Sequence, residues 1–215
     1  MRFDCVIWDW NGTLLSDVAE NIETINTLLR RRGIPVIADE ESYLARFSIP
    51  VREYYLELGF DLVGESFHDI AEEYITEYNK RIVRCGLYDG AAEVLRGLSE
   101  AGVRQYIVSS AEDTRLRGEV ESFGIAELFD GIYGNRNNLG GGKVAVAESL
   151  IAACGIPAER VLFVGDLTHD AEVAESVGCP CALIPKGHQS RARLAETDAA
   201  IIDDIKNILR YVTEE

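Results

Sequence analysis

FDCVIWDWNGT, residues Phe3–Thr13, joins a run typical of a buried strand to a polar turn. The segment Phe3–Trp8 combines β-branched and aromatic side chains in a short apolar run, which predicts a strand covered on both faces. Asp9 ends this run, and the residues Trp10, Asn11, Gly12 and Thr13 follow it. The opening of the chain therefore predicts a buried strand with an aspartate at its carboxyl end.

Apolar runs of the same kind recur along the chain and alternate with helical patterns. The further strands are expected at Val103–Val108, Val161–Val164, Cys181–Ile184 and, in a weaker pattern, Ala199–Ile202. The helices between and after them are expected at Ala91–Glu100 (with Asp89 as its cap), Lys143–Cys154, Asp170–Val177 and Asp204–Val212. Strands that alternate with helices are typical of a parallel sheet covered on both faces. We therefore expect an α/β fold with a doubly wound, Rossmann-like parallel sheet.

One region, from Ser16 to Arg84, interrupts this alternation because it has helical periodicity and no convincing strand pattern. Helices are expected there at Val18–Arg31, Glu40–Phe47, Val51–Leu58 and Phe67–Val83. A group of helices inserted after the first strand predicts a small all-helical domain over the sheet. The expected division is a core of residues 1–15 and 85–215 and a helical domain of residues 16–84.

The composition is that of a globular protein of 215 residues, 47% of them hydrophobic and 27% charged. The longest stretches without a charged residue are ten residues long, Ser149–Ala158 and Ser176–Pro185, and a membrane helix needs about 20 apolar residues. The net charge of −16 disfavours nucleic acid as a partner. Because no signal peptide precedes the first strand, we expect a cytoplasmic chain with five free cysteines, no membrane contact and a monomeric or homodimeric state.

Polar residues follow several of the predicted strands. Asp9 follows the first, Ser109 and Ser110 the second, and GDLTHD (Gly165–Asp170) the third, while Lys143 opens a helix after three glycines, residues 140–142. Ligands of open parallel sheets bind beyond the carboxyl ends of the strands. Three carboxylates there repel one another unless a cation lies between them, and oxygen ligands suit Mg²⁺.

These residues, in this order, resemble the haloacid dehalogenase-like superfamily of phosphohydrolases. DWNGT (Asp9–Thr13) matches the family's first motif, Asp-x-Asp-x-Thr, except at its third residue. Ser109 fits the second motif, Lys143 the third, and Gly165–Asp170 matches the fourth, Gly-Asp-x-x-x-Asp. The inserted helices correspond to the family's helical cap, and the phosphoglycolate phosphatase-like branch is the most similar. The resemblance implies release of phosphate from a small phosphorylated metabolite.

The resemblance also implies a Mg²⁺ cofactor and a covalent intermediate. Asp9 would be the nucleophile that forms an aspartyl-phosphate. Asp9, Asp166 and the backbone carbonyl of Asn11 would ligate the metal, with Asp170 supporting its water shell. These roles are physically reasonable, because a carboxylate attacks a dianion poorly unless a cation neutralises both.

Four side chains are implied in holding the phosphoryl group. Ser109 and Lys143 would bind its oxygens, Lys143 as a point charge, and Ser110 is the alternative to Ser109. Thr13 completes the first motif and is expected at the substrate. The chemistry would then be mostly positioning and charge stabilisation.

Asn11 departs from the family pattern, because phosphatases of the family normally have an aspartate there that protonates the leaving oxygen. An amide cannot do this. We favour a phosphatase that works on a good leaving group or with a substitute acid, for which His169 is the nearest candidate in sequence. The alternatives are a dehalogenase, a phosphonatase using Lys80, the only lysine in the helical insert, or a weakened domain that only binds phosphate or metal.

The helical insert offers one candidate for substrate selection. Arg46 and Arg52 flank the connection between two predicted helices, and their guanidinium groups could hold an anionic substrate tail.

Overall fold

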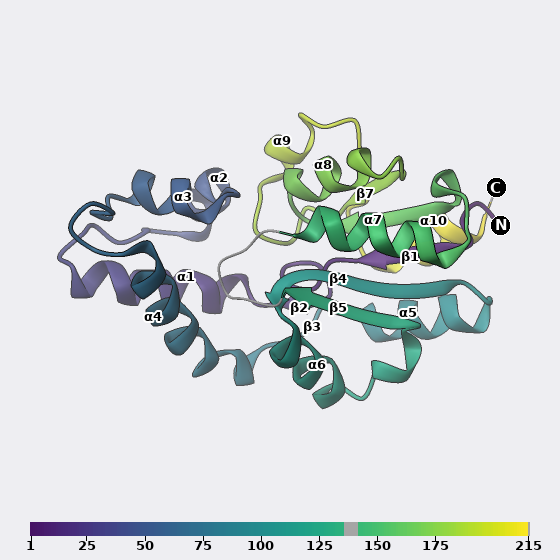
Figure 1. Cartoon of the computed structure of the whole chain (residues 1–215), viewed down its shortest axis with the longest axis horizontal. Helices are drawn as coiled ribbons and strands as arrows, with labels where there is room; N and C mark the ends of the chain where they lie inside the picture. Colours follow the sequence, from purple (N-terminus) through teal and green to yellow (C-terminus); the bar gives the residue numbers. More distant parts are fainter. Residues whose placement is uncertain (136–141, 215) are drawn as a thin grey trace.

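A six-stranded parallel sheet forms the larger part of the molecule (Figure 1). The computed structural model describes residues 1–135 and 142–214. Its strands are β1 (Cys5–Trp8), β4 (Arg104–Glu112), β5 (Gly131–Asn135), β6 (Val161–Gly165), β7 (Cys181–Leu183) and β8 (Ala200–Ile201), in the spatial order β5-β4-β1-β6-β7-β8. Each neighbouring pair is parallel. The predicted doubly wound α/β fold is therefore confirmed.

The two faces of the sheet bury alternate residues of β1. Cys5 and Ile7 pack under α7 (Lys143–Cys154) and α8 (Thr168–Ser176). Val6 and Trp8 belong to the core on the other face. Three helices cover that face: α5 (Ala91–Glu100), α6 (Asp113–Ser122) and α10 (Lys206–Thr213). A side-chain period of two places successive residues on opposite faces, and all four of these β1 side chains are buried. This explains why the strand reads as a continuous apolar run.

Some elements differ from the expectation. β5 was not predicted, and neither was the short antiparallel pair β2 (Leu15–Ser16) and β3 (Gly86–Leu87). β4 continues through Ser109 to Glu112, with an irregular register after Val108, so the expectation that this strand ends before Ser109 was wrong. Edge strands and two-residue pairs depend on a neighbour's backbone more than on their own side chains, which is why local pattern misses them.

The inserted helices are α1 (Val18–Arg31), α2 (Glu40–Arg46), α3 (Val51–Leu58) and α4 (Phe67–Asn79). They lie to one side of the sheet in Figure 1 and share an apolar cluster of their own, which includes Leu28, Tyr54 and Ile70. Within the described residues, no helix is long and apolar enough to cross a membrane. The separate cluster supports the division at residues 16 and 85, which stays a prediction.

The last expected helix of the insert is shorter than predicted. α4 ends at Asn79, and a separate 3₁₀ turn, η1 (Ile82–Arg84), follows it. The other short turns are η2 (Ala126–Leu128), η3 (Ala158–Arg160) and α9 (Arg191–Leu194).

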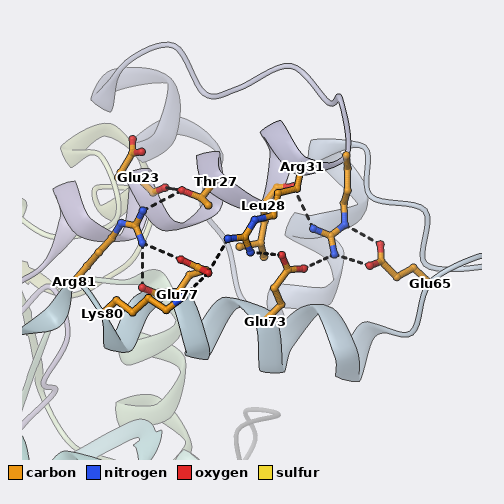
Figure 2. Close-up of polar contacts among 10 residues, drawn as sticks. Glu23, Thr27, Leu28, Arg31, Glu65, Glu73, Glu77, Lys80 and Arg81 are labelled. Atoms are coloured by element: carbon orange, nitrogen blue, oxygen red, sulfur yellow. Dashed lines mark hydrogen bonds and ion pairs between the residues drawn. The ribbon is translucent and has the colours of Figure 1, made fainter.

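Ion pairs join α1 to α4 along their exposed side (Figure 2). Arg31 donates to Glu73 at 2.6 Å and to Glu77 at 2.7 Å. Glu77 also accepts from Lys80 at 2.8 Å and from Arg81 at 3.4 Å. Glu77 of α4 thus accepts from Arg31 of α1 and from Lys80 and Arg81, which directly follow α4, so it holds α1 against the end of α4.

The start of α5 corrects one detail. Asp89 was expected to cap this helix, but Gly90 precedes it with φ +85° and Asp89 instead pairs with Lys206 of α10. Because a positive φ is unfavourable for other residues, the glycine, and not a side-chain cap, sets this turn.

Candidate active site

Three buried aspartates meet at the carboxyl edge of the sheet. Asp9 follows β1, Asp166 follows the adjacent β6, and Asp170 lies in the first turn of α8. A carboxylate oxygen from each lies within 4.8 Å of those from the other two. The topology thus brings together residues separated by more than 150 positions in the sequence.

Lys143, the first residue of α7, supplies the positive charge in this cluster. Its ammonium donates to Asp9 Oδ1 at 2.6 Å and to Asp170 Oδ1 at 2.5 Å, and all three side chains are buried. One ammonium faces three carboxylates, so the cluster keeps an excess of negative charge in a region of low dielectric.

Backbone groups and one hydroxyl hold the other oxygens of the cluster. Asp170 Oδ2 accepts from the amides of Asp166 and Leu167 at 3.0 Å each. Asp166 accepts from Thr13 Oγ1 at 3.0 Å and from the amide of His188 at 2.6 Å. These donors fix the carboxylates before any ligand arrives, which reduces the cost of organising a site.

The electrostatics show that the aspartates lack a full counter-charge. Burial raises the pKa of Asp9 to about 6, against the lowering effect of the Lys143 ammonium. Burial also raises the pKa of Asp166 to about 8, although His188 opposes the rise. A divalent cation among these oxygens would favour the ionised forms. The donor set, buried carboxylates that converge on one point, fits Mg²⁺.

Two glycines let the backbone come close to Asp166. A Cβ at Gly12, where φ is +74°, would lie 2.4 Å from Asp166 Oδ2, and one at Gly187 would lie 2.1 Å from the same atom. Both distances are too short for any side chain, so the two loops can surround this carboxylate only because these positions are glycine.

Asn11 lies beside this cluster as a hydrogen-bond donor. Its amide nitrogen donates to Asp17 Oδ2 at 2.8 Å and to the Tyr78 hydroxyl at 2.9 Å. The Tyr78 hydroxyl donates to the same oxygen of Asp17 at 2.6 Å. The side chain of Asn11 is therefore oriented by residues of the insert.

Asp17 and His188 form a second buried pair that the sequence prediction missed. His188 Nε2 lies 3.2 Å from Asp17 Oδ1, and the other ring nitrogen lies 2.9 Å from the Tyr43 hydroxyl. Although burial lowers it, the Asp17 carboxylate raises the pKa of His188 to about 9. Burial would raise the pKa of Asp17, but His188 and the donors Tyr78 and Asn11 hold it below its usual value.

A signal for His188 was present in the sequence. The residues after the strand Cys181–Leu183 reach the same edge of the sheet as those after β1 and β6, and His188 lies five residues beyond Leu183. Because ligands bind beyond the carboxyl ends of such strands, the loop after this strand was also a place to expect a site residue. The signal for Asp17 was weaker: it is its position at the start of the helical insert, eight residues after Asp9.

The two serines line the cavity over the aspartates, as do Asp9 and Lys143. Ser109 is buried and its hydroxyl accepts from the Ala111 amide at 3.1 Å, while Ser110 is exposed. Of the three glycines before Lys143, Gly142 lies just before α7, and residues 140 and 141 lie outside the described part of the chain.

The two arginines expected at the substrate tail are not brought to this site. Arg46 and Arg52 are exposed, and neither is among the described residues that line the cavity. Arg46 donates to the Glu57 carbonyl at 2.8 Å on the surface of the insert. His169 does line the cavity, with Nδ1 3.2 Å from Glu172.

Comparison with known proteins identifies several relatives. A family model for haloacid dehalogenase-like hydrolases matches residues 6–184. Tyrosine-protein kinase PtkA of Mycobacterium tuberculosis is 28% identical over 214 residues, covering 95% of this chain and 72% of that protein. Phosphoglycolate phosphatase of Pseudomonas savastanoi pv. phaseolicola is 21% identical over 216 residues, covering 95% and 78%. The matched range of the family model includes all three aspartates and Lys143.

Solved structures share the fold. A haloacid dehalogenase-like hydrolase from Streptococcus pneumoniae superposes with a TM-score of 0.83 at 19% identity, over 98% of each chain. The names of the relatives include a kinase as well as phosphatases, so these names alone do not fix the reaction of this chain.

Proposed function

Because this chain belongs to the haloacid dehalogenase-like hydrolase family, we propose that it is a Mg²⁺-dependent phosphohydrolase that acts through an aspartyl-phosphate on Asp9. Its substrate would be a small phosphorylated metabolite. The observation that carries the proposal is the convergence of Asp9, Asp166 and Asp170 within 4.8 Å around one buried lysine.

The metal would be held by Asp9, Asp166 and the backbone carbonyl of Asn11, with Asp170 supporting its water shell. Bound there, Mg²⁺ would supply the charge that lets a carboxylate approach a phosphoryl dianion. Asp166 already accepts hydrogen bonds from Thr13 at 3.0 Å and from the amide of His188 at 2.6 Å. The loops after β1 and β7 therefore hold this carboxylate in the position of a metal ligand.

The proposed reaction has two displacements at phosphorus. An oxygen of Asp9 forms a bond to phosphorus while the bond to the ester oxygen breaks, and that oxygen leaves with the bonding electrons. Water then attacks the phosphorus, releases phosphate and returns Asp9 as a carboxylate. Lys143 and Ser109, with Ser110 as the alternative to Ser109, would hold the phosphoryl oxygens during both steps, while the Thr13 hydroxyl donates to Asp166.

Asn11 cannot protonate the leaving oxygen, so the first displacement relies on a leaving group that is stable as an anion or takes its proton from water. The loss is tolerable, because general acid catalysis is typically worth about 10²–10⁴-fold and total accelerations commonly exceed 10⁶-fold. The three carboxylates around one point favour this metal-dependent reaction over a dehalogenase. A phosphonatase would need Lys80 at the site, but Lys80 pairs with Glu77 and is not among the described lining residues of the cavity.

The test is release of phosphate from 4-nitrophenyl phosphate by metal-free chain, with and without added Mg²⁺. We expect turnover only with Mg²⁺, loss of turnover in Asp9→Asn, and normal turnover in Asp203→Asn, which changes an exposed aspartate that is not part of the cluster. Turnover that persists in Asp9→Asn, or that ignores the metal, would contradict the proposal.

A further inference from the structure

The cavity over the aspartates is apolar at the end formed by the inserted helices. Its lining there consists largely of aromatic and aliphatic side chains, among them Ile25, Phe47, Val51, Tyr54, Tyr74 and Ile75. Among the described lining residues from positions 18–79, there is no lysine, arginine or histidine. A carboxylate or second phosphate placed at this end would lose water without gaining a partner.

The core adds further basic side chains to the cavity lining besides Lys143, namely Arg115 of α6 and His188, and His188 is paired with Asp17. The Arg115 guanidinium donates to Glu119 at 3.0 Å and lies over the Tyr78 ring, 5.4 Å from the centroid. The Arg115 Nε has no hydrogen-bond partner among the described residues, but this atom has almost no accessible surface, so Arg115 forms part of the cavity wall and offers no exposed anion-binding group.

Tyr54 carries a polar atom that the protein leaves without a partner. Its side chain is only 1% exposed, and within the described residues its hydroxyl has no hydrogen-bond partner. The ring contacts Phe47 edge-on, with centroids 5.2 Å apart. The hydroxyl has almost no accessible surface of its own, so Tyr54 contributes an aromatic wall to the cavity and offers no hydrogen bond to a ligand there.

Resting on the proposed function, we propose that the substrate is the phosphate monoester of a phenol-like alcohol. The phosphoryl group would lie at Asp9 and Lys143, and the ring would lie among the aromatic side chains of the cavity. The same class suits Asn11, because a phenolate leaves without being protonated, unlike an alkoxide.

Leaving-group acidity and the aromatic cavity can be separated with matched esters. Phenyl phosphate is compared with the phosphate of hexafluoroisopropanol, an alcohol about as acidic as phenol, and with 2-phosphoglycolate. We expect kcat/KM for phenyl phosphate to exceed both others by about tenfold or more, since only this substrate buries a ring. A preference for 2-phosphoglycolate, or equal values for the two acidic alcohols, would overturn the aromatic assignment.

A binding measurement keeps this inference separate from the proposed reaction. Titration calorimetry with phenylphosphonate and phosphonoacetate, on the chain with Mg²⁺, needs no turnover. Tighter binding of phenylphosphonate than of phosphonoacetate supports the aromatic cavity even if no ester is cleaved. In that case, the lack of cleavage counts against the proposed reaction only. Tighter binding of phosphonoacetate would overturn the inference even if phosphate is released.

Discussion

Asn11 is held as a donor by its neighbours, since its amide nitrogen lies within 2.9 Å of both the Asp17 carboxylate and the Tyr78 hydroxyl. At this position the surroundings suit an amide. A carboxylate there would face the buried charge of Asp17, and such a pair would hold a proton between its members.

Asn11→Asp should therefore create a protonated carboxyl group next to the leaving oxygen. We expect kcat on an alkyl phosphate to rise by about tenfold or more, and to rise less on 4-nitrophenyl phosphate, whose leaving group needs no proton. Steady-state kinetics on the two esters at constant Mg²⁺ measures the difference.

Asn21→Asp is the control for this change. The Asn21 amide also donates to Asp17, at 2.7 Å. This variant therefore places a new carboxyl group beside Asp17, as Asn11→Asp does, but leaves position 11 unchanged. Equal gains on both esters in Asn11→Asp, or the same gain in Asn21→Asp, would remove the argument from the leaving group.

At the residue scale, strand ends were readable from the sequence and loop paths were not. Asp9 and Asp166 follow apolar runs directly, so their convergence could be predicted from the order of elements. His188 reaches Asp17 across 171 positions, through a loop whose path depends on close approach at Gly187. No local pattern encodes that path.

At the scale of elements, two acidic residues of α4, Glu73 and ionised Glu77, bind Arg31 of α1. Hydrogen bonds from Lys80 and Arg31 lower the pKa of Glu77 from 4.5 to about 2. A lowered carboxyl pKa contributes stability that is present above the unfolded-state value and lost as pH falls through the folded-state value.

Glu77→Gln should therefore lower the chemical-denaturation midpoint at neutral pH and should differ less from the wild type as the pH approaches about 2. Denaturation curves of both proteins across this pH range measure the effect, with Glu72→Gln of the same helix for comparison. A stability difference that does not shrink in acid would show that the charge of Glu77 is not what joins the helices.

The helices were easier to predict than the strands. The bounds of α1, α3, α5 and α7 agree with the prediction. The first three have an apolar stripe, whereas α7 is apolar on several sides and is bounded by Gly142 and Gly155. β5 was missed because GIYGN contains two glycines and its one buried apolar side chain is Ile132, so its pairing with β4 forms it. α6 was missed because its sequence is mostly charged and buries only Leu116 and Val120.

At the scale of the whole molecule, the inserted helices touch the core beside the metal-binding candidates. The Ser190 amide donates to the Leu44 carbonyl at 3.2 Å, and Gln189 donates to the Phe47 carbonyl at 3.1 Å. Both core residues directly follow His188, so the loop whose backbone donates to Asp166 also forms hydrogen bonds with the insert. The insertion itself could be predicted from the sequence, whereas this docking could not.

The buried aspartates should make the stability of the metal-free chain fall as pH rises. Burial raises the pKa of Asp9 to about 6 and that of Asp166 to about 8, so the folded state binds more protons than the unfolded state between about pH 4 and 8. The raised pKa of His188 acts in the same direction. We expect the Tm of chelator-treated protein to decrease across this range.

Mg²⁺ should restore the stability that the metal-free chain loses at the alkaline end of this pH range. At a concentration 100 times the Kd, the ion would add about 2.7 kcal/mol to the free energy of unfolding. The rise in Tm should be small in Asp166→Asn and normal in Asp203→Asn. A wild-type Tm that does not respond to Mg²⁺ at about pH 8 would contradict the metal site.

The central claim is that Asp9 carries the phosphoryl group during turnover, and trapping that group tests it most directly. The chain is mixed with 4-nitrophenyl phosphate and Mg²⁺, quenched in acid and mapped by peptide mass spectrometry. We predict a hydroxylamine-sensitive phosphoryl group on Asp9, formed only when Mg²⁺ is present. Phosphate release by the same sample with the label on another residue, or with no label on Asp9 at any quench time, would contradict the account.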